Sequence, residues 1–169
     1  MFDLKGVDSL ENIVNDFLSE FGVSAFLGED FSYYFGEDKI EFAVAVGPSH
    51  EHFMAHFKEL APEIECDPFL ISLLHELGHH ETLYEMDDDD ADMSTWAKIE
   101  LENKLGETDD PQKIKYLHDA YYNLPDEKLA TDWAIDYIRQ NTNKVAYFWA
   151  AVQAEILKFY YLNGVTGDN

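Results

Sequence analysis

The sequence predicts an α+β fold, with a small, mostly antiparallel three-stranded sheet near the N-terminus and a mainly helical C-terminal part. Three short runs rich in aromatic and β-branched residues, at 23–27, 31–35 and 40–46, are separated by turn-like segments that contain Gly-Glu-Asp. Apolar residues then recur with helical spacing through most of the remaining chain. Because the chain has 169 residues, 46% of them apolar, we expect a single domain over 1–169.

Glycine and proline bound the elements of the first half. The N-terminal amphipathic pattern stops at Gly22, and Gly47-Pro48 ends the third β-like run. Ser49 can cap the helix that follows, and Pro68 is typical of the first turn of the next one. Helices are therefore expected over 8–21, 50–60 and 68 to about 84.

The second half reads as consecutive helices after an acidic run. The run Asp87–Asp90 lacks the glycine and the distal glutamate of a calcium loop, so we expect a solvated loop there. Pro111 and Pro125 start helices. The last helix carries apolar side chains around most of its circumference, which predicts either a core helix or a dimer contact. The expected ranges are about 93–105, 111–122, 125–138 and 143–162.

The charge of the chain limits its partners. There are 35 acidic and 11 basic residues, which gives a net charge of -24. Such a surface repels nucleic acids and anionic membranes, and it either favours basic protein partners or only maintains solubility. A single cysteine, Cys66, excludes an intramolecular disulfide, and Met1–Lys5 do not resemble the start of a signal peptide. We therefore expect a cytoplasmic protein, monomeric or homodimeric, without nucleic-acid or membrane binding.

The stretch His75-Glu76-Leu77-Gly78-His79 carries the chemistry. In a helix, two histidines four residues apart project from one face, where neutral imidazoles can hold one zinc ion. Glu76 lies about 100° around the helix, beside the metal, where its carboxylate can act as the general base for a metal-bound water. Gly78 leaves room for another chain or a substrate to approach. The leucines before His75 favour a buried helix over a surface helix with solvated histidines.

A catalytic zinc site needs a third protein ligand, and Glu127 is the first choice. It begins a helix in which Ala130 and Ala134 lie on one face and allow close packing against a neighbour. The alternative is that Glu127 only stabilises the dipole of its own helix. Other acids that could serve as the third ligand are Glu81, Glu85, Asp92 and Asp126.

A second pair of histidines, His52 and His56, also has a four-residue spacing. No acid suited to act as a base and no apolar lead-in accompany this pair. A solvated histidine face is therefore the preferred interpretation, and a second metal site is the alternative.

The motif His-Glu-Leu-Gly-His at 75–79, followed by Glu127-x-x-Ala130-x-x-Trp133-Ala134, resembles the zinc metallopeptidases of the ImmA/IrrE type. The resemblance covers about residues 66–138. It implies a minimal zincin-like domain in which His75, His79 and Glu127 bind zinc and Glu76 is the general base. Thr131 stands where the family usually has Asn or Asp, and Trp133 replaces Phe. The first departure implies a changed partner for the ligands and reduced activity.

The leading hypothesis is therefore a zinc-dependent metallopeptidase that hydrolyses a specific protein or peptide. By resemblance the substrates include phage-type repressors, and the acidic surface suits a basic, DNA-binding target. Side chains that could stabilise the oxyanion are His80, Tyr121, Tyr122 and Tyr137.

Two further hypotheses use the same residues differently. The acidic chain could imitate nucleic acid and inhibit a DNA-binding enzyme, as anti-restriction and anti-CRISPR proteins do, with a structural or vestigial zinc site. It could also be a metal-binding fold without activity. An inhibitor would act at one-to-one stoichiometry without cutting its partner.

Overall fold

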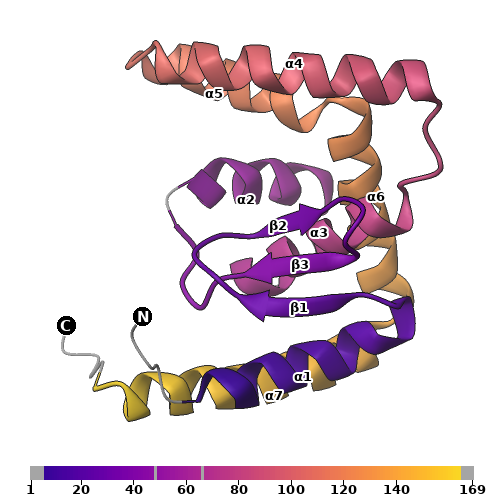
Figure 1. Ribbon diagram of the computed structural model, residues 1–169. Helices are drawn as coiled ribbons and strands as arrows, with labels where there is room; N and C mark the ends of the chain where they lie inside the picture. The colour runs from indigo at the N-terminus through magenta and orange to yellow at the C-terminus, as the bar shows by residue number, and fades with distance from the viewer. Residues whose placement is uncertain (1–5, 48, 66, 165–169) are drawn as a thin grey trace. The chain divides into compact units, whose positions relative to one another are not determined.

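The computed structural model describes residues 6–47, 49–65 and 67–164, and it confirms the predicted α+β class. The chain divides into two compact units, one formed by 1–44 with 138–169 and the other by 45–137. Figure 1 shows the small sheet in the first of these and the helices that make up the second. Cys66 and the N-terminal segment Met1–Lys5, on which two of the predictions depend, lie outside the described residues.

The first unit contains a mixed three-stranded sheet. Its strands are β1 (Ser24–Leu27), β2 (Ser32–Tyr34) and β3 (Lys39–Phe42), in the order β1-β3-β2. The β2–β3 pair is antiparallel and β1 runs parallel to β3, so the sheet is mixed where the sequence predicted a mostly antiparallel one. The β2–β3 hairpin turns tightly through Gly36 and Asp38, both with positive φ, and β1 joins the other edge of β3. Each strand is shorter than predicted.

Two helices pack together in this unit. The helix α1 (Val7–Leu18) continues into a 3-10 turn (Ser19–Phe21) and ends at Gly22, as predicted, and it lies beside α7 (Thr142–Leu162) (Figure 1). The Phe17 ring stacks on the Phe148 ring with 4.0 Å between their centres. Along one face α7 thus belongs to the core of this unit. Other apolar side chains of α7 are exposed, namely Tyr147, Leu157 and Tyr161.

The outer edge of β1 is completed by side chains of α1. The Asn15 side chain accepts a hydrogen bond from the Ala25 amide at 2.7 Å and donates one to the Ala25 carbonyl at 2.8 Å. The Leu27 amide donates to the Glu11 carboxylate at 2.7 Å. These bonds give the β1 backbone the partners that another strand would otherwise supply. The packing of α1 against the sheet is therefore specified by polar as well as apolar contacts.

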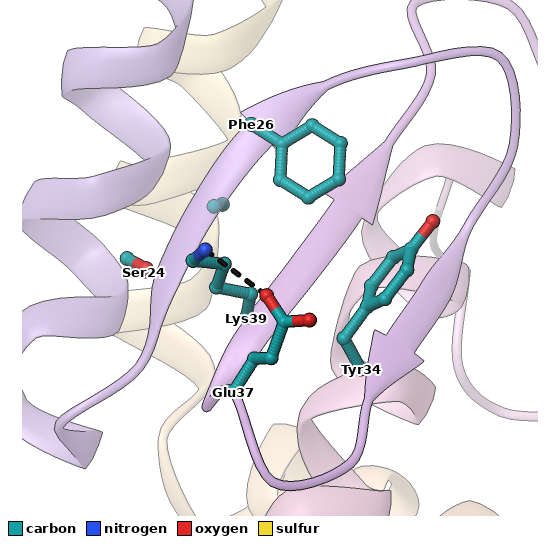
Figure 2. A pocket seen from close by; sticks show the side chains of 6 residues that line it. Ser24, Phe26, Tyr34, Glu37 and Lys39 are labelled. Carbon is teal, nitrogen blue, oxygen red and sulfur yellow. Dashed lines mark hydrogen bonds and ion pairs between the residues drawn. The ribbon is translucent and has the colours of Figure 1, made fainter.

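A pocket of about 440 Å³ lies on this sheet. Figure 2 shows the Phe26 and Tyr34 rings on its wall, tilted by 50° to each other with 5.7 Å between their centres. Lys39 pairs with Glu37 at 3.1 Å. Ser24 and Ala25 complete its lining. None of the residues predicted to bind metal lines this pocket.

The second unit is helical among its described residues. It consists of α2 (Ser49–Leu60), α3 (Pro68–Glu81), α4 (Asp88–Gly106), α5 (Pro111–Tyr122) and the part of α6 (Pro125–Gln140) up to residue 137. Asp67 caps α3 by accepting a hydrogen bond from the Phe69 amide at 2.8 Å, and Pro68 occupies the first turn, as predicted. In Figure 1, α4 and α5 lie side by side.

The acidic run does not form the predicted loop. The helix α4 begins at Asp88, five positions before the expected start at residue 93. Asp87 caps it by accepting a hydrogen bond from the Asp90 amide at 2.9 Å. Carboxylates in the first turn interact favourably with the positive end of the helix dipole, which explains why an acidic segment can be helical here.

In the part of the chain that the structure describes, no helix combines the length and the apolar character that crossing a membrane requires.

Candidate metal centre

Two helices meet backbone to backbone at the predicted site. Gly78 on α3 lies against α6, and a Cβ atom added there would be only 2.4 Å from the Ala130 carbonyl oxygen. Ala130 and Ala134 are both fully buried. The small residues therefore bring two segments of the same chain together, whereas the sequence left open whether Gly78 makes room for another chain or a substrate.

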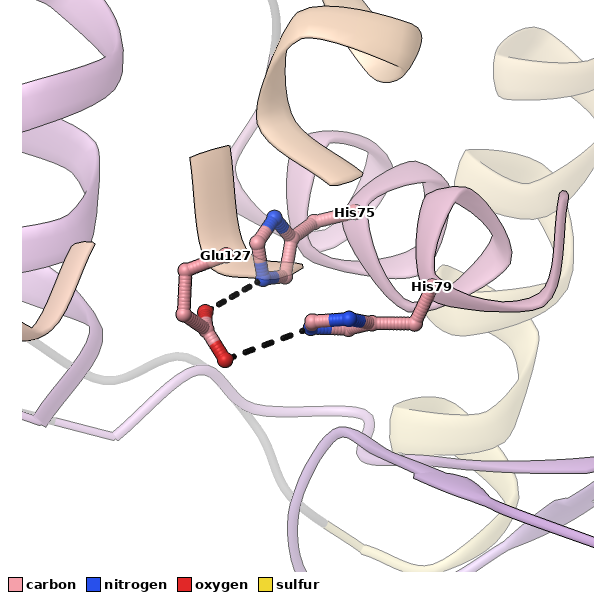
Figure 3. Close-up of side chains that lie close together, drawn as sticks. All are labelled: His75, His79 and Glu127. Atoms are coloured by element: carbon pink, nitrogen blue, oxygen red, sulfur yellow. Dashed lines mark hydrogen bonds and ion pairs between the residues drawn. The ribbon is translucent and has the colours of Figure 1, made fainter. Parts of the chain in front are cut away.

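This close approach brings the three predicted ligands together. His75 and His79 project from one face of α3, and Glu127 comes from the first turn of α6 (Figure 3). The Glu127 Oε2 atom is 3.0 Å from His75 Nε2, and its Oε1 atom is 3.4 Å from His79 Nε2. One donor atom of each residue lies within 4.8 Å of the others. The three side chains are thus close enough to bind a single metal ion.

The site is buried, and its carboxylate is ionised. His75 and Glu127 are only 5% and 3% exposed, whereas His79 is partly open to solvent. Burial alone would raise the pKa of Glu127, but the hydrogen bonds from His75 and His79 and their charge outweigh it and hold the pKa well below its usual value. Glu127 is therefore ionised, which is the state in which a carboxylate binds a metal.

Thr131 supports His75 from the side opposite the ligand atom. It is fully buried one turn after Glu127 on α6, and its Oγ1 atom lies 3.1 Å from His75 Nδ1. A metal on Nε2 requires the proton on Nδ1, so the imidazole would donate this hydrogen bond to the threonine hydroxyl. Thr131 therefore supplies a hydrogen-bonding oxygen to His75 from α6.

Replacing Thr131 by Val should weaken metal binding by about 10- to 100-fold, because it removes the oxygen that orients the His75 ring and would accept its Nδ1–H. Valine has nearly the same shape, so the packing around residue 131 is kept. Zinc affinity measured by competition with a chelating dye would test this expectation. Thr131→Ser keeps the hydroxyl and should bind zinc as the wild type does. Equal affinities of the valine and serine variants would show that the hydrogen bond does not support the ligand.

Sequence reasoning missed a lysine at this site. Lys98 of α4 is 2.5 Å from Glu127 Oε1 and also pairs with Asp126. Burial lowers the pKa of Lys98, but the two carboxylates together raise it above its usual value, so the ammonium group remains charged. The Ser94 hydroxyl, one turn before Lys98, donates to Asp126 at 2.5 Å. The signal in the sequence is slight, namely a lone lysine between acidic segments.

The other acids considered as third ligand do not join this group. Among the described residues, the cluster of possible metal donors contains His75, His79 and Glu127. Asp126 instead contacts Lys98 and Ser94. The remaining alternatives are not part of the cluster either: Glu81, Glu85 and Asp92. Glu76 lies beside His75 on α3 and is partly exposed, outside the ligand set.

The second histidine pair takes part in packing between α2 and α5. The His52 ring stacks on His118 with 4.1 Å between centres, and the His56 ring stacks on Tyr122 at 5.5 Å. Neither histidine belongs to a group of three possible donors in the described part of the chain. With this spacing, His52 and His56 on α2 both stack against aromatic side chains of α5.

Of the four residues considered for the oxyanion, Tyr121 lies in the electrostatic field of both Glu127 and Glu76. Burial raises its pKa most, and the charges of Glu127 and Glu76 are among those that raise it further, so its phenol stays protonated. Burial also raises the pKa of Tyr122 to about 12. The His80 imidazole lies 3.9 Å from Glu81, and the Tyr137 ring stacks on Trp133.

Comparison of the chain with known protein families, with characterised proteins and with solved structures finds no match.

Proposed function

We propose that this protein is a zinc-dependent metallopeptidase of the ImmA/IrrE type. The observation that carries the proposal is the meeting of His75, His79 and Glu127, from two helices, within 4.8 Å. Two imidazoles and one carboxylate are a donor set that zinc uses in hydrolytic sites, where a fourth position is left for water or substrate. The identity of the metal and the hydrolytic activity are inferred from this chemistry and from the resemblance of the two motifs.

Each residue has a defined task in this mechanism. His75, His79 and Glu127 would hold the zinc, which supplies an acidified water and polarises the scissile carbonyl. Glu76, beside the ligands, accepts a proton on its carboxylate and passes it to the leaving amine. Thr131 would accept the hydrogen bond of His75 Nδ1–H when Nε2 binds the metal. Tyr121 remains a neutral phenol and can donate a hydrogen bond to the oxyanion.

The proposed substrate is a basic protein or an exposed basic peptide segment. The net charge of -24 attracts positively charged partners and repels nucleic acid. We place such a reaction in the cytoplasm. A DNA-binding protein fits this chemistry because its binding surface is basic.

Metal content provides the first test of the proposal. Elemental mass spectrometry of wild-type protein purified without added zinc should find about one zinc per chain, as expected for a three-ligand site. Glu127→Ala should lose most of it, because two histidines alone leave the ion short of protein ligands. Glu81→Ala is the matched control, since Glu81 is an exposed acid on α3 outside the ligand cluster. Full retention of zinc by Glu127→Ala would assign the third ligand elsewhere.

The high acidity also favours a second candidate, an inhibitor that imitates nucleic acid. Wild-type protein without metal, even after zinc is offered, would favour this function over hydrolysis. A one-to-one complex with an uncut DNA-binding partner would do the same. Complex formation by charge imitation should weaken as salt rises, because screening acts on exposed charges.

A further inference from the structure

We propose that Lys98 is a positioning residue that limits Glu127 to one metal-binding oxygen. The Lys98 ammonium group lies 2.5 Å from Glu127 Oε1. The other oxygen, Oε2, lies 3.0 Å from His75 Nε2. This distance is shorter than the 3.4 Å between Oε1 and His79 Nε2. With Oε1 held by the lysine, Oε2 is the oxygen that Glu127 offers to the ion. This inference rests on the proposed metal centre.

The lysine is held in place by more than one contact. Its ammonium group also pairs with Asp126, and Asp126 is fixed in turn by the Ser94 hydroxyl. The Lys98 nitrogen lies 5.6 Å from the centre of the Tyr121 ring, within the range of a cation–π contact. The side chain of Lys98 is only 23% exposed. Because a largely buried ammonium group needs its anionic partners, Lys98 cannot leave the two carboxylates at low cost.

The consequence concerns the open coordination position. A carboxylate that binds zinc through both oxygens would place four protein donor atoms on the ion, two of them from Glu127. A hydrolytic site needs a position for water or the substrate carbonyl. By keeping Oε1, Lys98 leaves the site with three donor atoms from the protein. The lysine thereby favours a reactive site over a closed structural one.

Charge and geometry predict different effects when Lys98 is removed. Removing a positive charge beside a divalent ion strengthens the attraction for the metal. Releasing Oε1 adds a donor atom to the site. Lys98→Met is therefore expected to retain its metal and to raise the coordination number. Loss of affinity is not the expected effect, so the test must report the geometry of the site.

The test uses Co²⁺ as the probe, because its visible absorption is strong in four-coordinate sites and weaker when the coordination number rises. Wild-type protein loaded with Co²⁺ should absorb strongly, and Lys98→Met should absorb less per bound ion. Lys98→Arg should restore the wild-type spectrum, since a guanidinium fork can hold both carboxylates. Lys104→Met is the control on the same helix, because Lys104 pairs only with the exposed Glu100 among the contacts described for it.

The possible outcomes distinguish a failure of the role proposed for Lys98 from a failure of the proposed metal centre. Binding of Co²⁺ by Lys98→Met with the wild-type spectrum would overturn the role of Lys98 and leave the metal centre intact. A folded Lys98→Met that binds no Co²⁺ would also overturn it, since the lysine would then be required for the ligand. No binding by wild-type protein would refute both proposals. If Lys98→Met does not fold, Asp126→Asn takes its place in the test. This substitution weakens the contact that holds Lys98 without altering a proposed ligand, and it should also lower the absorption per bound Co²⁺.

Discussion

Glu76→Gln is expected to abolish hydrolysis while the protein keeps its zinc. Glutamine has nearly the same shape but cannot accept the proton from the metal-bound water. Loss of a general base typically costs about 10²- to 10⁴-fold in rate, which would take a modest activity below detection. Zinc content should not change, because Glu76 is not part of the ligand cluster. The rate should be measured on a peptide selected from a fluorogenic library with zinc-loaded wild-type protein.

The position of Glu76 explains why its substitution should stop hydrolysis without releasing zinc. It follows His75 on α3, about 100° further around the helix, and it is partly exposed where His75 is buried. Glu81→Gln supplies the control, as an exposed acid on the same helix. Hydrolysis by Glu76→Gln at the wild-type rate would eliminate the proposed mechanism. A parallel loss of zinc would instead make Glu76 part of the binding site.

Gly78→Ala is expected to destabilise the protein and weaken zinc binding together. The added Cβ atom would lie 2.4 Å from the Ala130 carbonyl oxygen and 2.9 Å from two further backbone atoms of Ala130. Backbone atoms cannot turn aside as a flexible side chain can, so α6 must move. Overpacking of this kind costs about 1–3 kcal/mol, which exceeds the gain of about 1 kcal/mol from the helix propensity of alanine. Glu127, one turn before Ala130, would move with α6.

Thermal unfolding with and without zinc, together with zinc affinity, would measure this coupling. Gly106→Ala is the matched control, because it is also a glycine of an α-helix and nothing lies within 4 Å of its added Cβ atom. It should leave both the unfolding temperature and the zinc affinity close to wild type or slightly raise the temperature. Unchanged zinc affinity in Gly78→Ala would mean that the contact at Ala130 does not set the distance between Glu127 and the histidines.

The sequence predicted those parts of the site that depend on local spacing. The positions of His75 and His79 follow from the helical repeat, and the choice of Glu127 followed from small residues that permit close packing. The structure places these three together, although their function stays a prediction. Thr131 entered only as a departure from a family pattern, because a hydroxyl and an imidazole from different helices have no signature in the chain.

Contacts between distant segments account for what was missed. Lys98 reaches Glu127 from a third helix, 29 positions earlier in the chain, and no motif links the two. The parallel β1–β3 pairing likewise depends on which edge of the β2–β3 hairpin receives β1. The early start of α4 depends on the Asp87 cap and on the favourable interaction of carboxylates with the first turn, which the acidic composition of the run does not reveal. Each of these outcomes is decided by packing or local electrostatics beyond the hydrophobic pattern.

The side chains along β1 also bear on how the protein avoids aggregation. An uncovered strand edge is a template for another chain, and repulsion between highly charged molecules opposes such pairing only while salt is low. Asn15 and Glu11 already hold the amide and carbonyl groups of Ala25 and the amide of Leu27. Since these short bonds are not screened as long-range repulsion is, the β1 edge stays protected at salt concentrations that suppress the effect of the net charge. The packing of α1 thus protects this edge from pairing with another chain, and the protection does not depend on the acidity of the protein alone.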